Sequence, residues 1–241
     1  MEKGGSLLSS FLLRMIALIS MMIDHAGLAL FPDVGLFRCI GRLAFPIYCF
    51  LLVQGYLHTH DLSAYGRRLL LLAILSEIPF DLLIFGRFAS PIEQNVLFSL
   101  LFALMALYCT DALKEKPLHA GAAILALCMC AMAANVSFGW LSIALCLGMR
   151  CAGNSKSRLM LNTCGALALY TLSLRFSGVT QSWVLVSLCA MAAIIPLLLY
   201  NGKQGFRHPL LTFLFYLAYP LHLIALLGIR ALRIVPPYFF Q

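Results

Sequence analysis

The stretch ISMMIDHAGLALF, residues 19–31, has the apolar density of a membrane helix, yet it carries two adjacent ionisable residues, Asp24 and His25. Insertion scales assign roughly 2.5–3.5 kcal/mol to a charged side chain at the centre of a membrane helix. Such residues are tolerated where they face the interior of a helical bundle or a wet cavity and find partners there. We therefore expect Asp24 and His25 to meet polar groups from other segments of the chain.

The composition of the whole chain indicates a polytopic membrane protein. Of its 241 residues, 62% are hydrophobic and 11% are charged, whereas soluble domains are about 45–50% apolar and about 25% charged. The apolar runs are long and continuous, which predicts helices and argues against a β-barrel. The net charge of +8 is distributed over the ends of these runs, as expected for topology signals, so we expect no nucleic-acid partner.

We predict an all-α bundle of about nine transmembrane helices, forming one domain over residues 1–241. Each span needs about 20 apolar residues, and the candidate segments run over about 11–31, 36–57, 67–86, 92–112, 117–134, 138–151, 158–176, 180–200 and 209–230. Most Lys and Arg residues lie on the same side as the N-terminus, which favours a cytoplasmic N-terminus.

No metal site is expected from the sequence. The nine cysteines lie mostly singly within apolar segments and lack the spacing of zinc ligands, so we interpret them as small buried hydrophobic residues. The HTHD stretch at 58–61 offers too few ligands for a metal ion.

Polar residues of five segments fall at a similar depth in the outer half of this predicted bundle. They are Asp24, His25, Arg42, Glu77, Asp81, Gln94, Asn95, Tyr219 and His222. We expect them to meet in one solvated pocket, where Arg42 and the carboxylates neutralise one another. Glu77 and Asp81 share a helix face, and either pair with Arg42 or have a direct role. Asp24 either orients His25 or binds Arg42, because neighbours on a helix point about 100° apart.

A second polar set lies at the opposite, cytoplasmic rim of the predicted bundle and includes Arg67, Arg68 and Lys203. The two arginines are explained equally well as topology anchors or as phosphate ligands, since guanidinium groups match phosphate oxygens in geometry. Lys203 lies in a glycine-rich loop and has the same two explanations.

Several sequence blocks together resemble the TraX family of membrane proteins, whose namesake acetylates conjugative pilin in the inner membrane. These blocks are ISMMIDHAGL, IGRLAFPIYCFLLVQGYLHTHDLSAYGRRLL, SEIPFDLLIFG, QNVLFSLL, YNGKQG and FYLAYPLHLIALLGI. They cover about 19–101 and 200–229, while the middle of the chain is similar only in hydropathy. The family usually has an acidic, aromatic-containing turn near ANVSFGWL, where this chain carries Asn135.

The resemblance implies a multi-pass protein of the cytoplasmic (inner) membrane that transfers an acetyl group from cytoplasmic acetyl-CoA to an acceptor at the outer face. It implies His25 as the general base, with Asp24 as its partner. It also implies substrate or donor binding by Arg42, Glu77, Asp81, Gln94, Asn95, Tyr219 and His222. Similarity in plan to other transmembrane acyltransferases implies that arginines of the inner rim dock the CoA phosphates. The expected partners are membrane lipid, acetyl-CoA, and a pilin, peptide or glycan acceptor that offers an amine or a hydroxyl.

The chemistry of these residues is compatible with that function without requiring it. An α-amine has a pKa near 7.7–8.0 and needs a base to free its lone pair, and histidine suits this task at neutral pH. Two other classes of function remain open. Charged residues and proline-broken helices at membrane depth are also typical of transporters and flippases, and a non-enzymatic membrane assembly factor would need no base at His25.

Overall fold

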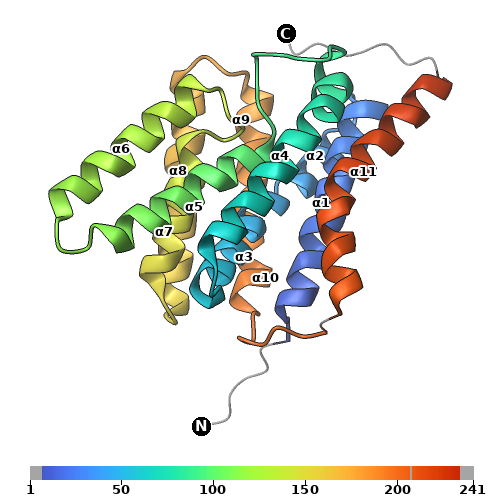
Figure 1. Cartoon of the computed structure of the whole chain (residues 1–241). Helices are drawn as coiled ribbons and strands as arrows, with labels where there is room; N and C mark the ends of the chain where they lie inside the picture. The colour runs from blue at the N-terminus through green and yellow to red at the C-terminus, as the bar shows by residue number, and fades with distance from the viewer. Residues whose placement is uncertain (1–6, 207, 234–241) are drawn as a thin grey trace.

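The computed structural model describes residues 7–206 and 208–233 and shows an all-helical bundle in this part of the chain (Figure 1). The helices, in chain order, are α1 (Ser10–Leu30), α2 (Gly35–Gly41), α3 (Ala44–His58), α4 (Leu62–Phe85), α5 (Val96–Ala112), α6 (Pro117–Ala133), α7 (Trp140–Ala152), α8 (Lys156–Phe176), α9 (Gln181–Leu188), a 3-10 turn (Cys189–Ala193), α10 (Ile194–Leu198) and α11 (Pro209–Arg233). The predicted helical fold class is confirmed.

Side-chain caps and glycines define several helix ends. Ser9, Asp61, Asn95 and Ser155 cap the N-termini of α1, α4, α5 and α8, each accepting a hydrogen bond from a backbone N–H of the first turn, as N-cap residues commonly do. Gly86 ends α4 in the left-handed conformation, at φ 67°. The helix boundaries thus follow from local chemistry.

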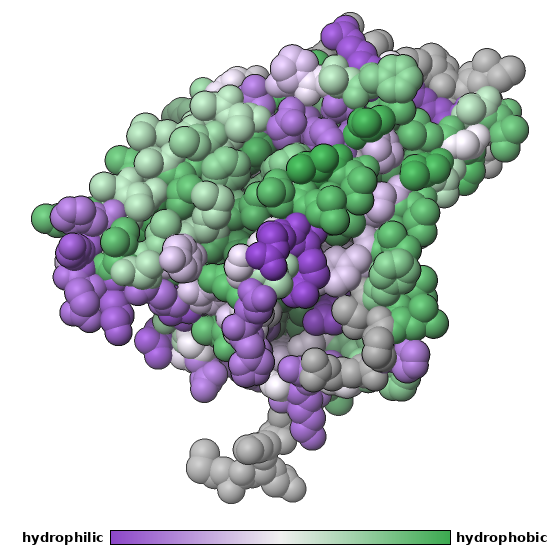
Figure 2. All heavy atoms as spheres, viewed as in Figure 1, coloured by the Kyte–Doolittle hydropathy of each residue, from purple (hydrophilic) through white to green (hydrophobic). Residues whose placement is uncertain are grey.

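Among the described residues, five helical stretches are long and apolar enough to cross a membrane: Ser10–Leu30, Gly35–His58, Lys156–Phe176, Gln181–Leu198 and Phe213–Leu232. α5, α6 and α7 are shorter apolar helices, and α4 carries four charged residues. Large hydrophobic side chains cover much of the flank of the bundle, and hydrophilic residues gather toward its ends (Figure 2). This surface supports a membrane protein, and the count of nine spans stays a prediction.

Two predicted segments have different boundaries in the structure. The segment expected over 36–57 is interrupted near Arg42, which closes α2 before α3 begins. The segment expected over 67–86 begins earlier, at Leu62, because Asp61 caps it. The break after α2 brings Arg38 and Arg42 to the same end of the bundle as the C-terminal half of α1.

α2 packs very closely against α1, and glycines make this contact possible. A Cβ atom at Gly41 would lie 2.1–2.4 Å from atoms of the Asp24 side chain, and one at Gly27 would lie 2.4 Å from Cβ of Phe37. No side chain larger than hydrogen fits at either position without displacing its neighbour. The side chain of Asp24 is therefore pressed against the backbone of α2.

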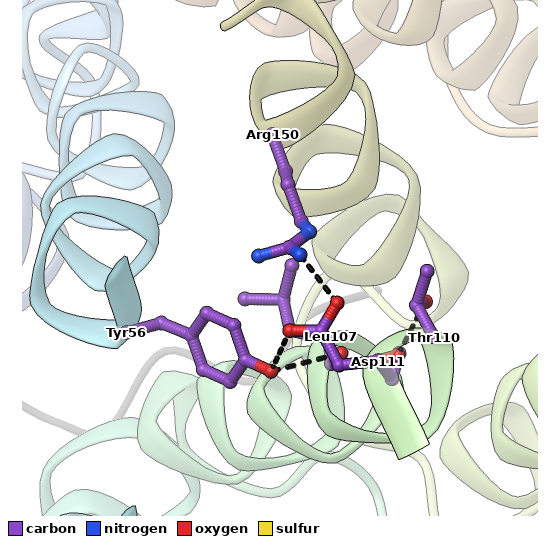
Figure 3. Close-up of polar contacts among 6 residues, drawn as sticks. Tyr56, Leu107, Thr110, Asp111 and Arg150 are labelled. Atoms are coloured by element: carbon purple, nitrogen blue, oxygen red, sulfur yellow. Dashed lines mark hydrogen bonds and ion pairs between the residues drawn. The ribbon is translucent and has the colours of Figure 1, made fainter. Parts of the chain in front are cut away.

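A polar cluster joins α3, α5 and α7 near the C-terminal ends of these three helices (Figure 3). The Tyr56 hydroxyl donates to Asp111 at 2.5 Å and to the Leu107 carbonyl at 3.2 Å, and Arg150 forms an ion pair with Asp111. The guanidinium carbon of Arg150 also lies 5.3 Å from the centroid of the Tyr56 ring. The Asp111 side chain is 44% exposed, so we interpret this cluster as a structural tie at the membrane surface.

Substituting Gly41 with alanine tests the close packing of α1 and α2. We expect Gly41→Ala to destabilise the protein by about 1–3 kcal/mol, the usual cost of overpacking, because the new methyl group would overlap the Asp24 side chain. Gly35→Ala is the matched control, since a Cβ there meets nothing within 4 Å. The measurement is thermal unfolding in detergent. Equal melting temperatures for the two variants would contradict the packing described here.

Candidate functional site

A cavity of about 530 Å³ lies at the end of the bundle where α1 and α4 finish and α7 begins. Its volume is within the usual range of ligand pockets, about 300–1,000 Å³. Asp24, His25, Arg38, Arg42 and Glu93 all line it. We call it the histidine cavity, and it brings together ionisable groups from three separate regions of the sequence.

Asp24 and His25 have different partners although they are neighbours in the sequence. The Asp24 carboxylate accepts a hydrogen bond from Arg38 Nη1 at 2.6 Å, and only 15% and 13% of the two side chains are exposed. His25 points instead toward α11, which packs against α1. This divergence follows from the 100° turn between consecutive helical residues. The Asp24 carboxylate therefore pairs with Arg38, and not with Arg42 or His25, the two partners that the sequence suggested.

The ring of His25 is fixed by His222. His25 Nδ1 lies 2.7 Å from His222 Nε2, and the two rings are nearly parallel, with an interplanar angle of 7°. His222 Nδ1 lies 2.8 Å from the Ala218 carbonyl oxygen, which can only accept, so His222 Nδ1 carries a proton. Neutral His222 then accepts at Nε2, and His25 Nδ1 must be the donor. This assignment leaves a lone pair on His25 Nε2, as a general base requires.

Arg42 lies between two aromatic rings at the wall of the histidine cavity. Its guanidinium carbon is 5.7 Å from the centroid of Phe138 and 5.5 Å from that of Trp183. Its Nε atom is buried without a hydrogen-bond partner among the described residues. A guanidinium with unused donors in a cavity is suited to a developing negative charge or a carbonyl oxygen of a bound molecule.

Glu93 and the loop between α6 and α7 form the opposite wall. The Ser137 hydroxyl lies 2.5 Å from Glu93 Oε1 and 2.9 Å from the Gln94 carbonyl oxygen. Backbone hydrogen bonds join Gln94 to the loop in both directions, from Gln94 N to the Asn135 carbonyl at 2.9 Å and from Ser137 N to the Gln94 carbonyl at 3.0 Å. This pairing sets the position of Glu93, which sequence reasoning had missed.

Four residues that we expected in the pocket hold α4 and α5 together instead, and none of them lines the histidine cavity. Asn95 donates to Glu77 at 2.5 Å and to the Ala73 carbonyl at 2.9 Å. Asp81 accepts from the backbone N–H of Ser90 at 2.7 Å. The amide of Gln94 donates to the Ser90 carbonyl at 3.0 Å. In the described part of the chain, Arg42 pairs with neither Glu77 nor Asp81. These carboxylates instead accept hydrogen bonds from Asn95 and Ser90, between α4 and α5.

A second cavity, of about 310 Å³, lies between the opposite halves of α1, α3 and α4 and is also lined by α5 and α11. It is lined mainly by apolar side chains, with Arg14 and Arg68 near the N-terminal ends of α1 and α4 and Tyr219 in the middle of α11. We call it the tyrosine cavity. A third cavity, of about 290 Å³, adjoins it and shares lining residues with it, including Arg14 and Thr59.

A ring contact connects the linings of the two main cavities. Tyr219 lines the tyrosine cavity, and its ring lies edge-on to His25, with centroids 6.3 Å apart, and to His222 at 5.5 Å. His25 lines the histidine cavity on the other side. His25 therefore lines the histidine cavity and contacts, through Tyr219, the lining of the tyrosine cavity. The two cavities lie along opposite halves of α1: Arg14 lines one and Asp24 the other, about 15 Å apart at 1.5 Å per residue.

The rim residues that we predicted as phosphate ligands have different surroundings. Arg68 lines the tyrosine cavity. Arg67 is exposed and donates to Ser63 at 2.9 Å, on its own helix. Lys203 is exposed in a loop whose backbone pairs with the start of α1, and it lines none of the three cavities. Arg14, which sequence reasoning had left out of this set, joins Arg68 at the cavity.

Several residues of the histidine cavity were missed by sequence reasoning. They are Arg38, Glu93, Ser137, Phe138, Tyr170 and Trp183. Arg38 precedes Arg42 by four residues, a helical spacing that could have indicated it, and Glu93 is next to Gln94. Phe138 lies in the ANVSFGWL stretch, where the family resemblance indicated an aromatic-containing turn. Tyr170 and Trp183 come from segments with only apolar patterning, so no local signal identifies them.

Comparison with known proteins assigns the family. The family model described as TraX protein matches residues 9–230. The chain belongs to the TraX family. It is 31% identical over 233 residues to the probable fimbrial assembly protein FimC, serogroup H1, of Dichelobacter nodosus, covering 91% of this chain and 94% of that protein. It is also 51% identical over 39 residues to the uncharacterized protein RP591 of Rickettsia prowazekii (strain Madrid E), 16% of each chain. No solved structure matches.

Removing Arg38 tests the buried ion pair of this TraX protein. We expect Arg38→Ala to destabilise the protein by up to about 3–5 kcal/mol, because Asp24 would remain as an unpaired charge at membrane depth. Arg150→Ala is the control, since its ion pair with Asp111 is more exposed and exposed pairs contribute about 0–1 kcal/mol. Both are measured by denaturant unfolding in detergent. A loss for Arg38→Ala no larger than that for the control would contradict the pairing.

Proposed function

We propose that this TraX protein is a membrane acetyltransferase that moves an acetyl group from acetyl-CoA to an amine or hydroxyl of an acceptor. The observation that carries the proposal is the placement of His25: its Nδ1 is held by His222 at 2.7 Å, and its ring lines the histidine cavity and contacts Tyr219, which lines the tyrosine cavity. A single base reached by two substrates from opposite ends is what a transfer across a membrane requires. The acceptor is a pilin-like peptide, by analogy with the fimbrial assembly protein to which the chain is similar.

In this proposal His25 Nε2 takes a proton from the acceptor as its nucleophile attacks the thioester carbonyl. A positioned base contributes typically 10²–10⁴-fold to such reactions. His222 does not touch the substrates: it is a positioning residue that keeps His25 in the tautomer with a free Nε2. Asp24 supports the site indirectly, by anchoring Arg38 in the cavity wall.

Arg42 is the candidate to stabilise the oxyanion that forms on the carbonyl oxygen. Its Nε is buried without a partner in the described residues, and it lines the same cavity as His25. Donors that are already in place contribute strongly to catalysis because they need no reorganisation during the reaction.

Acetyl-CoA would reach His25 through the tyrosine cavity. Its phosphates would bind Arg14 and Arg68, which both lie near enough to the Tyr65 hydroxyl to interact with it electrostatically. Its slender pantetheine arm would follow the apolar walls toward Tyr219. This path differs from the docking at Arg67 and Lys203 that the sequence suggested, because those two side chains line neither main cavity.

A transporter is the second candidate, since two cavities separated by a buried constriction also occur in proteins with alternating access. Acetyl transfer by the purified protein, with release of free CoA, would support the enzyme. Movement of a substrate across vesicles without acetyl-CoA would support the transporter.

The roles of the two histidines can be separated by kinetics. We expect His25→Ala to reduce kcat at least about 100-fold. His222→Ala should reduce kcat by a smaller factor, with the KM for acetyl-CoA unchanged. His25 remains as the base in this variant, but no partner determines which of its two ring nitrogens carries the proton. The double variant should be no slower than His25→Ala alone, since residues that act as a unit are not additive. Additive losses would show that His222 does not act through His25.

The donor path is tested with two adjacent arginines. We expect Arg68→Gln to raise the KM for acetyl-CoA about tenfold or more, because a charge-assisted contact to phosphate is lost. Arg67→Gln is the matched control and should leave the KM unchanged. Acetyl-pantetheine lacks the nucleotide phosphates, so its KM should be the same for all three proteins. Equal KM values for acetyl-CoA in the two variants would exclude this path.

A further inference from the structure

The histidine cavity contains a carboxylate that the acetyl transfer described above does not use. Glu93 is half-buried in the cavity wall, and no cationic nitrogen lies within 4.0 Å of it among the described residues. The other acid of the cavity, Asp24, is already paired with Arg38 at 2.6 Å. Arg38 attracts Glu93 only from a greater distance. Glu93 is therefore the carboxylate of this cavity that is available to a positively charged group.

The backbone around Glu93 is built in a way that fixes this carboxylate. Ser137 donates to Glu93 Oε1, so Oε2 stays available. The loop that carries Ser137 contains two residues other than glycine with positive φ, Asn135 at 50° and Phe138 at 61°. Bulky side chains rarely adopt this conformation, and such residues cluster at functional sites.

The strained loop is held by contacts on both sides of Ser137. The Asn135 side chain donates to the Pro91 carbonyl at 3.1 Å. The Phe138 ring stacks on Phe45, with centroids 3.9 Å apart. These contacts connect the strained loop to the segment before α5 and to α3. Their combined result is a rigid wall from which Glu93 faces the cavity that His25 lines.

We propose that Glu93 is the specificity-determining residue for the acceptor: its carboxylate, oriented by Ser137, binds the ammonium group of an amine and so selects amines over hydroxyls. This inference rests on the proposed transfer reaction and names the class of its acceptor. A hydroxyl acceptor is neutral and gains no ion pair from Glu93. An amine is protonated at neutral pH, since its pKa is near 7.7–8.0 for an α-amine, so it arrives as the charged form that Glu93 attracts.

The reaction balances with the groups in place. Glu93 holds R–NH₃⁺, and His25 Nε2 removes one proton to free the nitrogen lone pair. The nitrogen forms a C–N bond to the thioester carbonyl carbon, and the C–S bond breaks as the tetrahedral adduct collapses. The thiolate takes the proton from His25, and the second proton of the nitrogen passes to solvent. The products are the acetylamide, CoA thiol and one proton.

The test compares two acceptors that differ only in the reacting group, Ala-Ala-Ala-amide and lactyl-Ala-Ala-amide, in which a hydroxyl replaces the amine. With the purified full chain, we expect Glu93→Gln to raise the KM for the amine peptide at least about tenfold and to leave the KM for the hydroxyl peptide unchanged. Ser137→Ala should give a smaller change in the same direction, and Glu93→Asp should restore part of the affinity. Glu115→Gln removes an equal charge from an exposed side chain outside the cavity and is the matched control.

The outcomes separate this inference from the proposed reaction. Equal KM changes for both peptides, or none, would overturn the role of Glu93 while acetyl transfer stands. If neither peptide is acetylated, equilibrium dialysis of labelled Ala-Ala-Ala-amide decides: binding that is weakened by Glu93→Gln keeps the ammonium site although the reaction fails. No binding of that peptide, or binding that Glu93→Gln leaves unchanged, would reject the ammonium site.

Discussion

The ion pair between Asp24 and Arg38 is the interaction on which the site depends. Only 15% and 13% of these two side chains are exposed in a protein whose flank is apolar, and neither charge would be tolerated there alone. The pair forms because Gly41 lets α2 approach α1 until its backbone touches the Asp24 side chain. Once α2 is fixed in this way, Arg38 and Arg42 both line the cavity, and Trp183 of α9 lies against both guanidinium groups.

A second constraint determines the chemistry of His25. The Ala218 carbonyl oxygen can only accept a hydrogen bond, and this one fact sets the tautomer of His222 and then that of His25. The hydrogen bonds begin at the Ala218 carbonyl in α11, near Pro220, and cross from His222 to His25 on α1, which packs against α11. His25 is thus oriented by backbone and imidazole groups, and the adjacent carboxylate of Asp24 pairs with Arg38 in the cavity wall.

The polar residues at the end of the bundle that contains the histidine cavity have three tasks. Glu77, Asp81 and Asn95 hold the α4–α5 junction, and Asp24 and Arg38 hold α1 to α2. His25, Arg42 and Glu93 remain for a bound molecule. Only the last group combines a free lone pair, unused N–H donors and an unpaired carboxylate in one cavity of the described chain. Acyl transfer to an amine would use all three.

The sequence by itself determined the class of protein, the positions of most helices and the family, because apolar periodicity, caps and signature blocks are local properties. It also indicated that Asp24, His25 and Arg42 belong together, since their charges at membrane depth require partners. The partners themselves were decided by the tertiary structure. Arg38 replaced Arg42 beside Asp24 because α2 ends at Arg42, and Glu93 entered the site because a strained loop some 40 residues later in the chain pairs with Gln94. Such contacts depend on how distant helices pack, and no local pattern in the chain encodes them.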